Sequence, residues 1–405
     1  MSSVSATPQR DTVPRVQHVP YFQTLLDGVG EEQSFDELRM SLRQAAVDLT
    51  RRAGGRVAAS RVGDAYTAWS TTADALGELM RLGLVERKPL PSKRDNVDAH
   101  RASRFALTAE GQRLEEETRR KESAFRAAIA PLLIQSHPYF AAVLDLLAHG
   151  PLVLPEYTEE MLRGFKDADG HWIPHLGADA AARIQRSMPG ATTSADEVTA
   201  RLTVGLRRRF TSGTAPRPKA VLDTVQDILV AATLTAFELK IDAVTFNVLA
   251  SWGSYLYVLS ESRYVAGVAG RVMWETADIT RTGEGIVVQW RGLKAFGDRV
   301  AKELAQAYRE LADDKVGGEP GYFPYVPIYE VRALAAYRVG VSDQIVDRVI
   351  AELADQTRPA AFRVELALGA GNWQATSERP FRLGERRYYV ILIKPEPQAE
   401  RSNRS

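Results

Sequence analysis

Apolar residues recur at helical spacing in the first third of the chain. Leu76, Leu79 and Met80 fall at positions i, i+3 and i+4, which places them on one face of a helix. Residues 84–88 and 105–108 then have the composition of two short strands, separated by a long polar run. The pattern therefore predicts a helix followed by a β-hairpin with a basic tip.

Two further helices are expected before this unit. Ser34 is a good helix N-cap, and Glu37 three residues later completes a capping box for a helix that runs to about residue 49. A second helix is expected over 57–69, and Ser70-Thr71-Thr72 begins the third. After the hairpin, Thr108 can cap a charged helix that extends to about residue 133. The predicted order is three helices, a two-stranded hairpin and a long helix.

Two short motifs lie within this order. Residues 79–85 read L-x-x-x-G-L-V, and residues 107–111 read L-T-x-x-G. Both resemble motifs of the winged-helix superfamily, in particular the MarR and PadR regulators, where the first ends the recognition helix and the second closes the wing. The resemblance covers residues 34–122. It implies an N-terminal winged helix-turn-helix, and it suggests a dimer formed through the helix after the wing.

The resemblance also implies a set of DNA contacts. In this fold the recognition helix faces the major groove and basic wing residues hold phosphates. Asp74 and Glu78 on the same helix oppose such contacts, because phosphate repels carboxylates. Winged helices also dock proteins, so docking alone stays open. The candidate DNA-binding residues are Thr71, Thr72, Ala75, Arg81, Lys88, Lys93, Arg94, Arg101 and Arg104.

The rest of the chain divides at stretches of linker composition. Residues 211–219 and 317–327 are rich in Gly and Pro. Apolar helical stripes lie between them, and after them a helix pair precedes two strand-like runs with a polar tip between. We therefore predict a mainly α protein with a winged helix at each end, the second more degenerate. The expected segments are 1–17 disordered, 18–135 N-terminal winged helix and long helix, 136–212 helical connector, 220–316 apolar helical bundle, 327–394 C-terminal winged-helix-like α+β domain and 395–405 tail.

Composition narrows the chemistry that the chain can perform. The 405 residues contain no cysteine, which excludes disulfides, thiolate metal ligands and a cysteine nucleophile. The net charge of +1 means that any basic surface is local. No secretory signal and no run of about 20 apolar residues is present, so we expect a cytoplasmic protein that does not enter a membrane. No cofactor and no metal are expected.

One constellation resembles an enzyme site. Asp227, Glu238 and Lys240 have the D…E-x-K spacing of metal-dependent nucleases, in which two carboxylates hold Mg²⁺. That site needs two adjacent strands, whereas the apolar spacing here is helical. No nucleophile elbow, HExxH motif or dinucleotide fingerprint is present.

These observations favour a non-enzymatic protein that binds double-stranded DNA through its first winged helix. Because a simple transcription regulator seldom carries so long an extension, we expect a subunit of a larger DNA-handling assembly, as in mobile-element (antiviral) defence, replication or chromosome organisation. The chain is expected to self-associate and to bind protein partners through its C-terminal domain. Two alternatives stay open: an adaptor scaffold similar to the kleisins that never touches DNA, and the nuclease.

Overall fold

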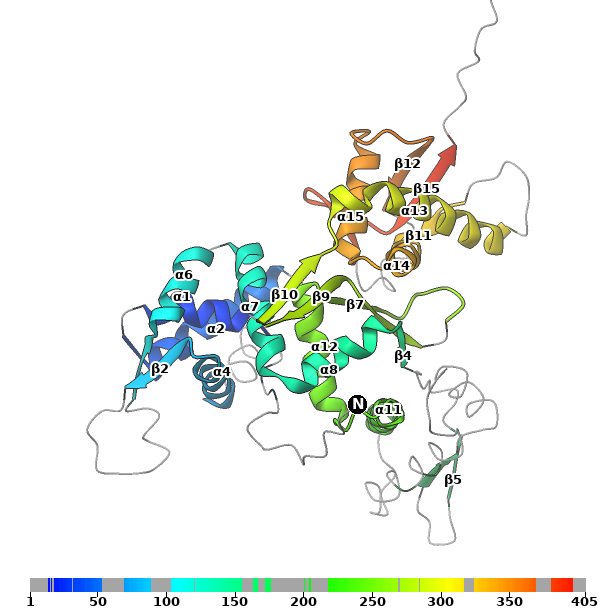
Figure 1. The fold of residues 1–405 in the computed structure, drawn as a ribbon. Coiled ribbons are helices and arrows are strands. Elements are labelled where there is room, and N and C mark those ends of the chain that lie inside the picture. The colour runs from blue at the N-terminus through cyan, green and yellow to red at the C-terminus, as the bar shows by residue number, and fades with distance from the viewer. Residues whose placement is uncertain are drawn as a thin grey trace, which may run out of the picture. The chain divides into compact units, whose positions relative to one another are not determined.

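The structure is a computed structural model, and its fold divides into two compact units. Unit 1 comprises Met1–Val143, Leu239–Leu256 and Ile279–Val288; unit 2 comprises Leu144–Glu238, Tyr257–Asp278 and Gln289–Ser405. Each mixes helices with small antiparallel sheets, so the fold is α+β with helix predominant (Figure 1). The residues described are 14, 16, 18–30, 32–52, 69–88, 103–119, 121–154, 163–166, 172–175, 200, 204, 218–268, 270–283, 285–316, 324–368 and 380–395.

Unit 1 is built from helices around one small sheet. The sheet has the order β1-β3-β2, with both pairs antiparallel. The elements of unit 1 are α1 (Pro20–Val29), β1 (Gln33–Ser34), α2 (Phe35–Arg52), α4 (Trp69–Arg81), β2 (Val85–Lys88), β3 (Arg104–Leu107), α6 (Ala109–Thr118), α7 (Glu122–Ser136), the first half of α8 (Pro138–Ala148) and α12 (Ala243–Leu256).

The start of α2 confirms the capping box predicted from the sequence. Glu37 Oε2 accepts hydrogen bonds from the Ser34 backbone N–H at 2.8 Å and from its hydroxyl at 2.7 Å. The Glu37 N–H donates back to Ser34 Oγ at 3.4 Å. These hydrogen bonds from the Ser34 side chain and backbone lower the pKa of Glu37, because they stabilise the ionised carboxylate.

Helix α1 was not expected from the sequence. Its apolar side buries Tyr21, Phe22, Leu25, Leu26 and Val29. These residues keep helical spacing, and Pro20 occupies the first turn, where its missing N–H costs nothing. The signal was therefore present. It was obscured because the residues before it, which the sequence assigned to a disordered start, have no periodicity.

The two motifs that carry the winged-helix resemblance contact each other. Thr108 caps α6 by accepting the Gly111 N–H at 3.0 Å, and its hydroxyl donates to the Gly83 carbonyl at 2.6 Å. The Thr108 N–H donates to the Leu84 carbonyl at 3.1 Å. A Cβ on Gly111 would lie 1.9 Å from that carbonyl oxygen. Glycine at 111 therefore lets the first turn of α6 lie against the chain that leaves α4.

This approach predicts a large effect for a small substitution. We expect Gly111→Ala to lower the free energy of unfolding by about 2 kcal/mol or more, since backbone has to move to admit the methyl group. Gly77→Ala, in the middle of α4, is the matched control because a Cβ there meets nothing within 4 Å. Alanine at 77 should stabilise by about 0.5–1 kcal/mol through helix propensity. Urea unfolding measures both; equal losses at the two positions would contradict the packing argument.

The long helix expected after the hairpin is interrupted. Helix α6 ends at Thr118 and α7 begins at Glu122, so the prediction of one helix over 109–133 is wrong.

Among the described residues, no single helix has the length and apolar content of a membrane span. Helices α7 and α8 reach that length and apolar content only as a pair, which is bent by 103° at its junction.

Unit 2 carries the larger share of strands. Two three-stranded antiparallel sheets have the orders β4-β8-β7 and β11-β15-β12, and β5-β6 and β13-β14 are two-stranded. Its elements are β4 (Leu152–Leu154), β5 (Arg163–Lys166), β6 (Trp172–His175), α11 (Pro218–Ala236), β7 (Leu259–Ser262), β8 (Arg271–Glu275), α13 (Leu293–Val316), β11 (Val326–Pro327), α14 (Ile328–Val339), α15 (Asp343–Ala354), β12 (Phe362–Ala367), β13 (Phe381–Leu383), β14 (Arg386–Tyr388) and β15 (Val390–Pro395).

These strands correct the expected domain content. The segment 220–316 is not a purely helical bundle, because β7, β8 and the paired strands β9 (Ala277–Thr282) and β10 (Gly285–Trp290) lie inside it. Its helix α12 belongs to unit 1, whereas α11 and α13 belong to unit 2. The expected helical connector, 136–212, contains the strands β4, β5 and β6. Short apolar runs of this kind do not distinguish strand from helix by periodicity alone.

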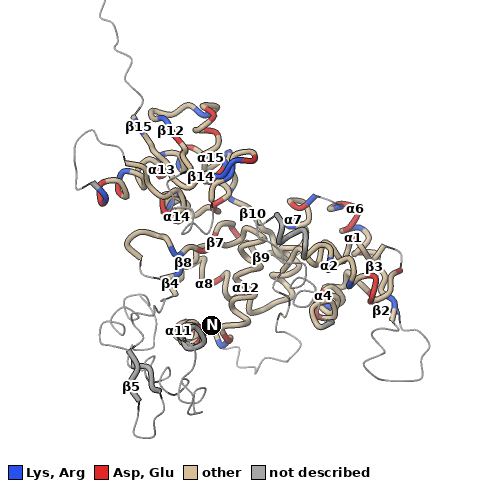
Figure 2. The backbone as a smooth tube through the Cα atoms, turned by 180° about the vertical axis from the view of Figure 1, so that it is seen from behind, with Lys and Arg blue, Asp and Glu red and all other residues tan. Residues whose placement is uncertain are grey.

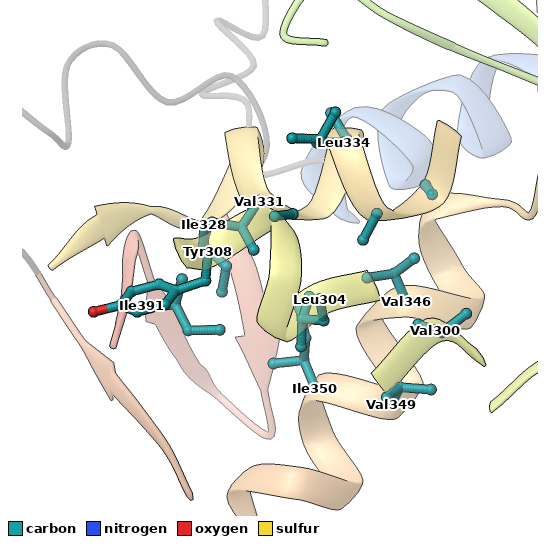
Figure 3. Packing of buried hydrophobic residues seen from close by; sticks show 14 of the residues in the cluster. Val300, Leu304, Tyr308, Ile328, Val331, Leu334, Val346, Val349, Ile350 and Ile391 are labelled. Carbon is teal, nitrogen blue, oxygen red and sulfur yellow. The ribbon is translucent and has the colours of Figure 1, made fainter. Parts of the chain in front are cut away.

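The core of unit 2 contains the predicted apolar stripes of α13 and α15, with the helix α14 packed against them. On α13, Val300, Leu304 and Tyr308 are at most 1 % exposed. They pack with Ile328 and Val331 of α14, with one face of α15 and with Ile391 of β15, as Figure 3 shows. The face of α15 in this core consists of Val346, Val349, Ile350 and Leu353. On α13 and α15 the buried residues keep steps of three and four, so helical amphipathicity predicts which face of each is buried. Helix α14 has buried residues at consecutive positions, as expected of a helix covered on most sides.

Candidate nucleic-acid interface

Two of the basic residues predicted to contact DNA, Lys88 and Arg104, lie on the hairpin β2–β3. Its register pairs Val85 with Leu107 at one end and Lys88 with Arg104 at the other. Directly opposed residues of an antiparallel pair project to the same face, so the two cations lie side by side where the hairpin opens into residues 89–102. Like charges in this arrangement destabilise a strand pair. An anion beside them is therefore favourable.

Carboxylates near this cation pair bind it only weakly. Glu32 lies 3.9 Å from Lys88 Nζ and 3.6 Å from Arg104 Nε, and Glu86 lies 3.9 Å from Lys88 Nζ. Both basic side chains keep about half of their surface in solvent, at 51 % and 47 %. Exposed ion pairs at these distances each contribute about 0–1 kcal/mol to the free energy of folding. Phosphate oxygens could replace these carboxylates at little cost. In Figure 2, blue for Lys and Arg is visible at the end of the hairpin near the label β2.

Helix α4 does not present all of the residues predicted to read DNA. Thr72 is 1 % exposed and Ala75 is fully buried, so neither reaches a groove in this conformation. Thr71 is half-buried. Glu78, expected to be exposed and to repel phosphate, is 7 % exposed. Lys93, Arg94 and Arg101 lie outside the described residues.

The sequence contained a signal for this orientation. Thr72 and Ala75 precede the buried Leu76 and Leu79 by four residues each, so they belong to the same inward face of the helix. The α4 positions that are not buried include Ser70, Ala73, Asp74, Gly77 and Arg81. The burial of Thr72 and Ala75 therefore follows from the same helical spacing as that of Leu76 and Leu79.

Arg81 is held by internal partners. Its Nη2 lies 2.5 Å from Glu78 Oε2 and also contacts the ring of His137, at 3.0 Å from Nδ1. His137 Nε2 is 3.2 Å from the same Glu78 oxygen, and its ring meets Trp252 edge to face at 4.7 Å between centroids. His137 is 1 % exposed. Arg81 therefore joins α4 to the α7–α8 junction and is oriented by that contact; nothing local in the sequence marks His137 as its partner.

A second cationic hairpin lies in unit 2. The register of β13–β14 places Arg382 directly opposite Arg387, and Arg386 opposite Leu383. All three arginines are exposed, with Glu385 in the turn beside Gly384, whose φ is +59°. Among the described residues, no ion pair is formed by Arg386 or Arg387. This hairpin repeats the opposed-cation arrangement of β2–β3. Figure 2 shows Lys and Arg positions in blue at β14.

The nuclease constellation lacks the scaffold that its chemistry needs. Asp227 lies within α11, and Glu238 follows the end of that helix in a turn with φ of +63°. Neither residue is on a strand, so the pair does not form the two-strand metal site of such nucleases. Within the described part of the chain, no group of three or more His, Asp or Glu residues is arranged to hold a metal ion.

Comparisons with known proteins add no relatives to this picture. No protein-family model, no curated protein and no solved structure matches the chain.

Proposed function

We propose that this protein binds double-stranded DNA through the hairpin β2–β3 and the basic segment between its strands. The observation that carries the proposal is the opposed pair Lys88 and Arg104 at the end of the hairpin, from which the chain continues to Lys93, Arg94 and Arg101. A cationic hairpin of this kind supplies phosphate contacts, which provide most of the sequence-independent affinity for DNA.

The contact between the two motifs supports a winged-helix reading of unit 1. The end of α4 and the start of α6 are joined through Thr108, Gly111 and Leu84. This junction fixes the hairpin close to α4, which is the arrangement that a helix and an adjacent wing need to engage one duplex. On α4, Ser70 is exposed and Thr71 is half-buried, so these two side chains remain available for contact with a duplex.

Salt dependence of binding tests the proposal directly. We expect the full chain to bind a mixed-sequence duplex at low salt, with log K falling linearly as log salt rises. Removing both cations in Lys88→Gln/Arg104→Gln should reduce the magnitude of that slope by about 1.8, because each phosphate contact contributes about 0.9. Reversing charge at Lys93, Arg94 and Arg101 should abolish binding. Fluorescence anisotropy on a labelled duplex measures both effects.

The matched control removes two exposed cations elsewhere in unit 1. Arg113→Gln/Lys121→Gln, on α6 and at the start of α7, changes the net charge equally and should leave the slope unchanged. No binding by the unaltered chain at low salt, or an equal loss of slope in both double variants, would reject the hairpin as the interface.

An adaptor that docks proteins without contacting DNA is the second candidate. The burial of Thr72 and Ala75 favours it, since α4 then offers few side chains for base recognition. The adaptor hypothesis predicts no duplex binding at any salt concentration and a partner that co-purifies with the chain. In either case we propose that the protein is a subunit of a larger DNA-handling assembly. We also propose that it self-associates through α6–α7 and binds protein partners through its C-terminal elements.

A further inference from the structure

Unit 2 contains a polar cavity, partly open to solvent, that the proposed DNA binding does not use. Its volume is about 280 Å³. Strands β7 and β8 and the loop between them line one part, and helices α14 and α15 line another. Pockets for drug-sized ligands measure roughly 300–1,000 Å³. The cavity is therefore large enough for a small metabolite and too small for a peptide or a nucleic acid.

The helical side of the cavity contains a buried guanidinium. Arg332 of α14 is 4 % exposed. Its Nη1 donates to Asp347 at 3.2 Å, and its Nε lies 4.0 Å from Asp343 at the start of α15. Burying a charge is costly unless it is paired, and this arginine is paired with two carboxylates of the neighbouring helix α15. It gives the cavity a fixed positive charge with a carboxylate on the same wall.

The strand side contains a second pair of opposite charges. Glu261 of β7 and Arg271 of β8 lie 3.6 Å apart, measured from Oε2 to Nε. That oxygen of Glu261 is shielded from solvent and accepts no hydrogen bond from the described residues. A buried carboxylate oxygen without a donor costs about 1–3 kcal/mol or more. A donor from a bound molecule would remove that cost.

Two tyrosines supply the aromatic part of the lining. The rings of Tyr264 and Tyr329 meet edge to face, with centroids 4.4 Å apart. Burial raises the pKa of Tyr329 to about 12, so its hydroxyl stays protonated at neutral pH. The face of a tyrosine ring attracts a cation such as an ammonium group. These rings favour a ligand whose donor is cationic.

Charge balance decides what kind of molecule fits. The walls carry Arg263, Arg271 and Arg332 against Glu261 and Asp343, and Asp347 pairs with Arg332 from behind. The net charge of these six side chains is therefore zero. A simple anion would add negative charge beside two carboxylates, and a simple cation would add positive charge beside three guanidinium groups. A molecule that carries one positive and one negative charge leaves the net charge unchanged. Its positive group can pair with a carboxylate of the walls and its negative group with a guanidinium group.

We propose that this cavity binds a small zwitterion of the free amino acid class. Its ammonium group donates to Glu261 Oε2 beside the tyrosine rings, and its carboxylate accepts from the guanidinium of Arg271. The proposal is independent of DNA binding, because every residue that it uses belongs to unit 2.

Thermal unfolding of the full chain with single added compounds tests the proposal. The probes are the standard L-amino acids, each tested alone, with acetate and methylammonium as ligands of one charge only. At a hundredfold excess over its Kd, at least one amino acid should raise Tm by about 2 °C or more, and neither single-charge ligand should do so. No shift with any amino acid, or an equal shift with acetate or methylammonium, overturns the proposal.

Matched variants then locate the site. Glu261→Gln keeps the side-chain shape and should weaken binding of that amino acid about tenfold or more in titration calorimetry. Glu365→Gln makes the same chemical change on β12, at an exposed residue paired with Lys394 at 3.1 Å, and should bind as the unaltered chain does. Arg271→Lys, which keeps the charge but loses the planar fork, should also weaken binding. Unaltered affinity in both cavity variants overturns the assignment, and their Tm values without ligand confirm that they fold.

Discussion

Replacing Trp252 with alanine is expected to lower the free energy of unfolding of unit 1 by about 4 kcal/mol. This side chain is fully buried on α12. Its ring meets Phe22 of α1 and Phe140 of α8 edge to face, at 6.1 Å between centroids in each case, and also meets His137. Its indole N–H donates to the Val16 carbonyl at 2.6 Å. One residue therefore joins segments that are distant in sequence.

Two further substitutions separate the parts of this effect. Trp252→Phe keeps an aromatic ring and loses the hydrogen bond and part of the volume, so it should cost about 1–2 kcal/mol. Met40→Ala on α2 removes a large apolar side chain that is 63 % exposed, and it should change stability by less than about 0.5 kcal/mol. Urea unfolding followed by far-UV circular dichroism gives all three values. A loss for Trp252→Ala no larger than that for Met40→Ala would show that α12 does not anchor unit 1.

Replacing Arg332 with alanine should lower the free energy of unfolding of unit 2 by about 3 kcal/mol. The substitution leaves Asp343 and Asp347 without their buried counter-charge. The value lies at the low end for buried ion pairs, because Asp347 keeps 33 % of its side chain in solvent and can be partly hydrated.

Arg338 on the same helix provides the matched control. It forms two hydrogen bonds with Glu310, at 3.0 Å and 2.5 Å, but both side chains are substantially exposed, at 30 % and 44 %. Arg338→Ala should therefore cost less than about 1 kcal/mol. Both variants are compared by urea unfolding at neutral pH. Equal losses would mean that burial does not set the strength of these ion pairs.

Local signals in the sequence specified many of the elements. The periodic stripes of α13 and α15, the capping box at Ser34 and the cap at Thr108 were all identifiable, because each depends on residues within a few positions of one another. The strands of unit 2 were harder to recognise. A short run such as β8 is apolar on both faces, so its period is neither clearly two nor clearly 3.6.

The sequence by itself determined the helical stripes, the caps and the basic composition of the hairpin segment, since these follow from neighbouring residues. Tertiary structure alone decided that Arg81 meets His137, that Trp252 of α12 packs with Phe22 of α1, and that Arg332 lines one cavity with Glu261 and Arg271. The physical reason is that burial and pairing depend on contacts between segments far apart in the chain. No local pattern encodes which charged residue loses its solvent, and that loss gives the candidate sites their chemistry.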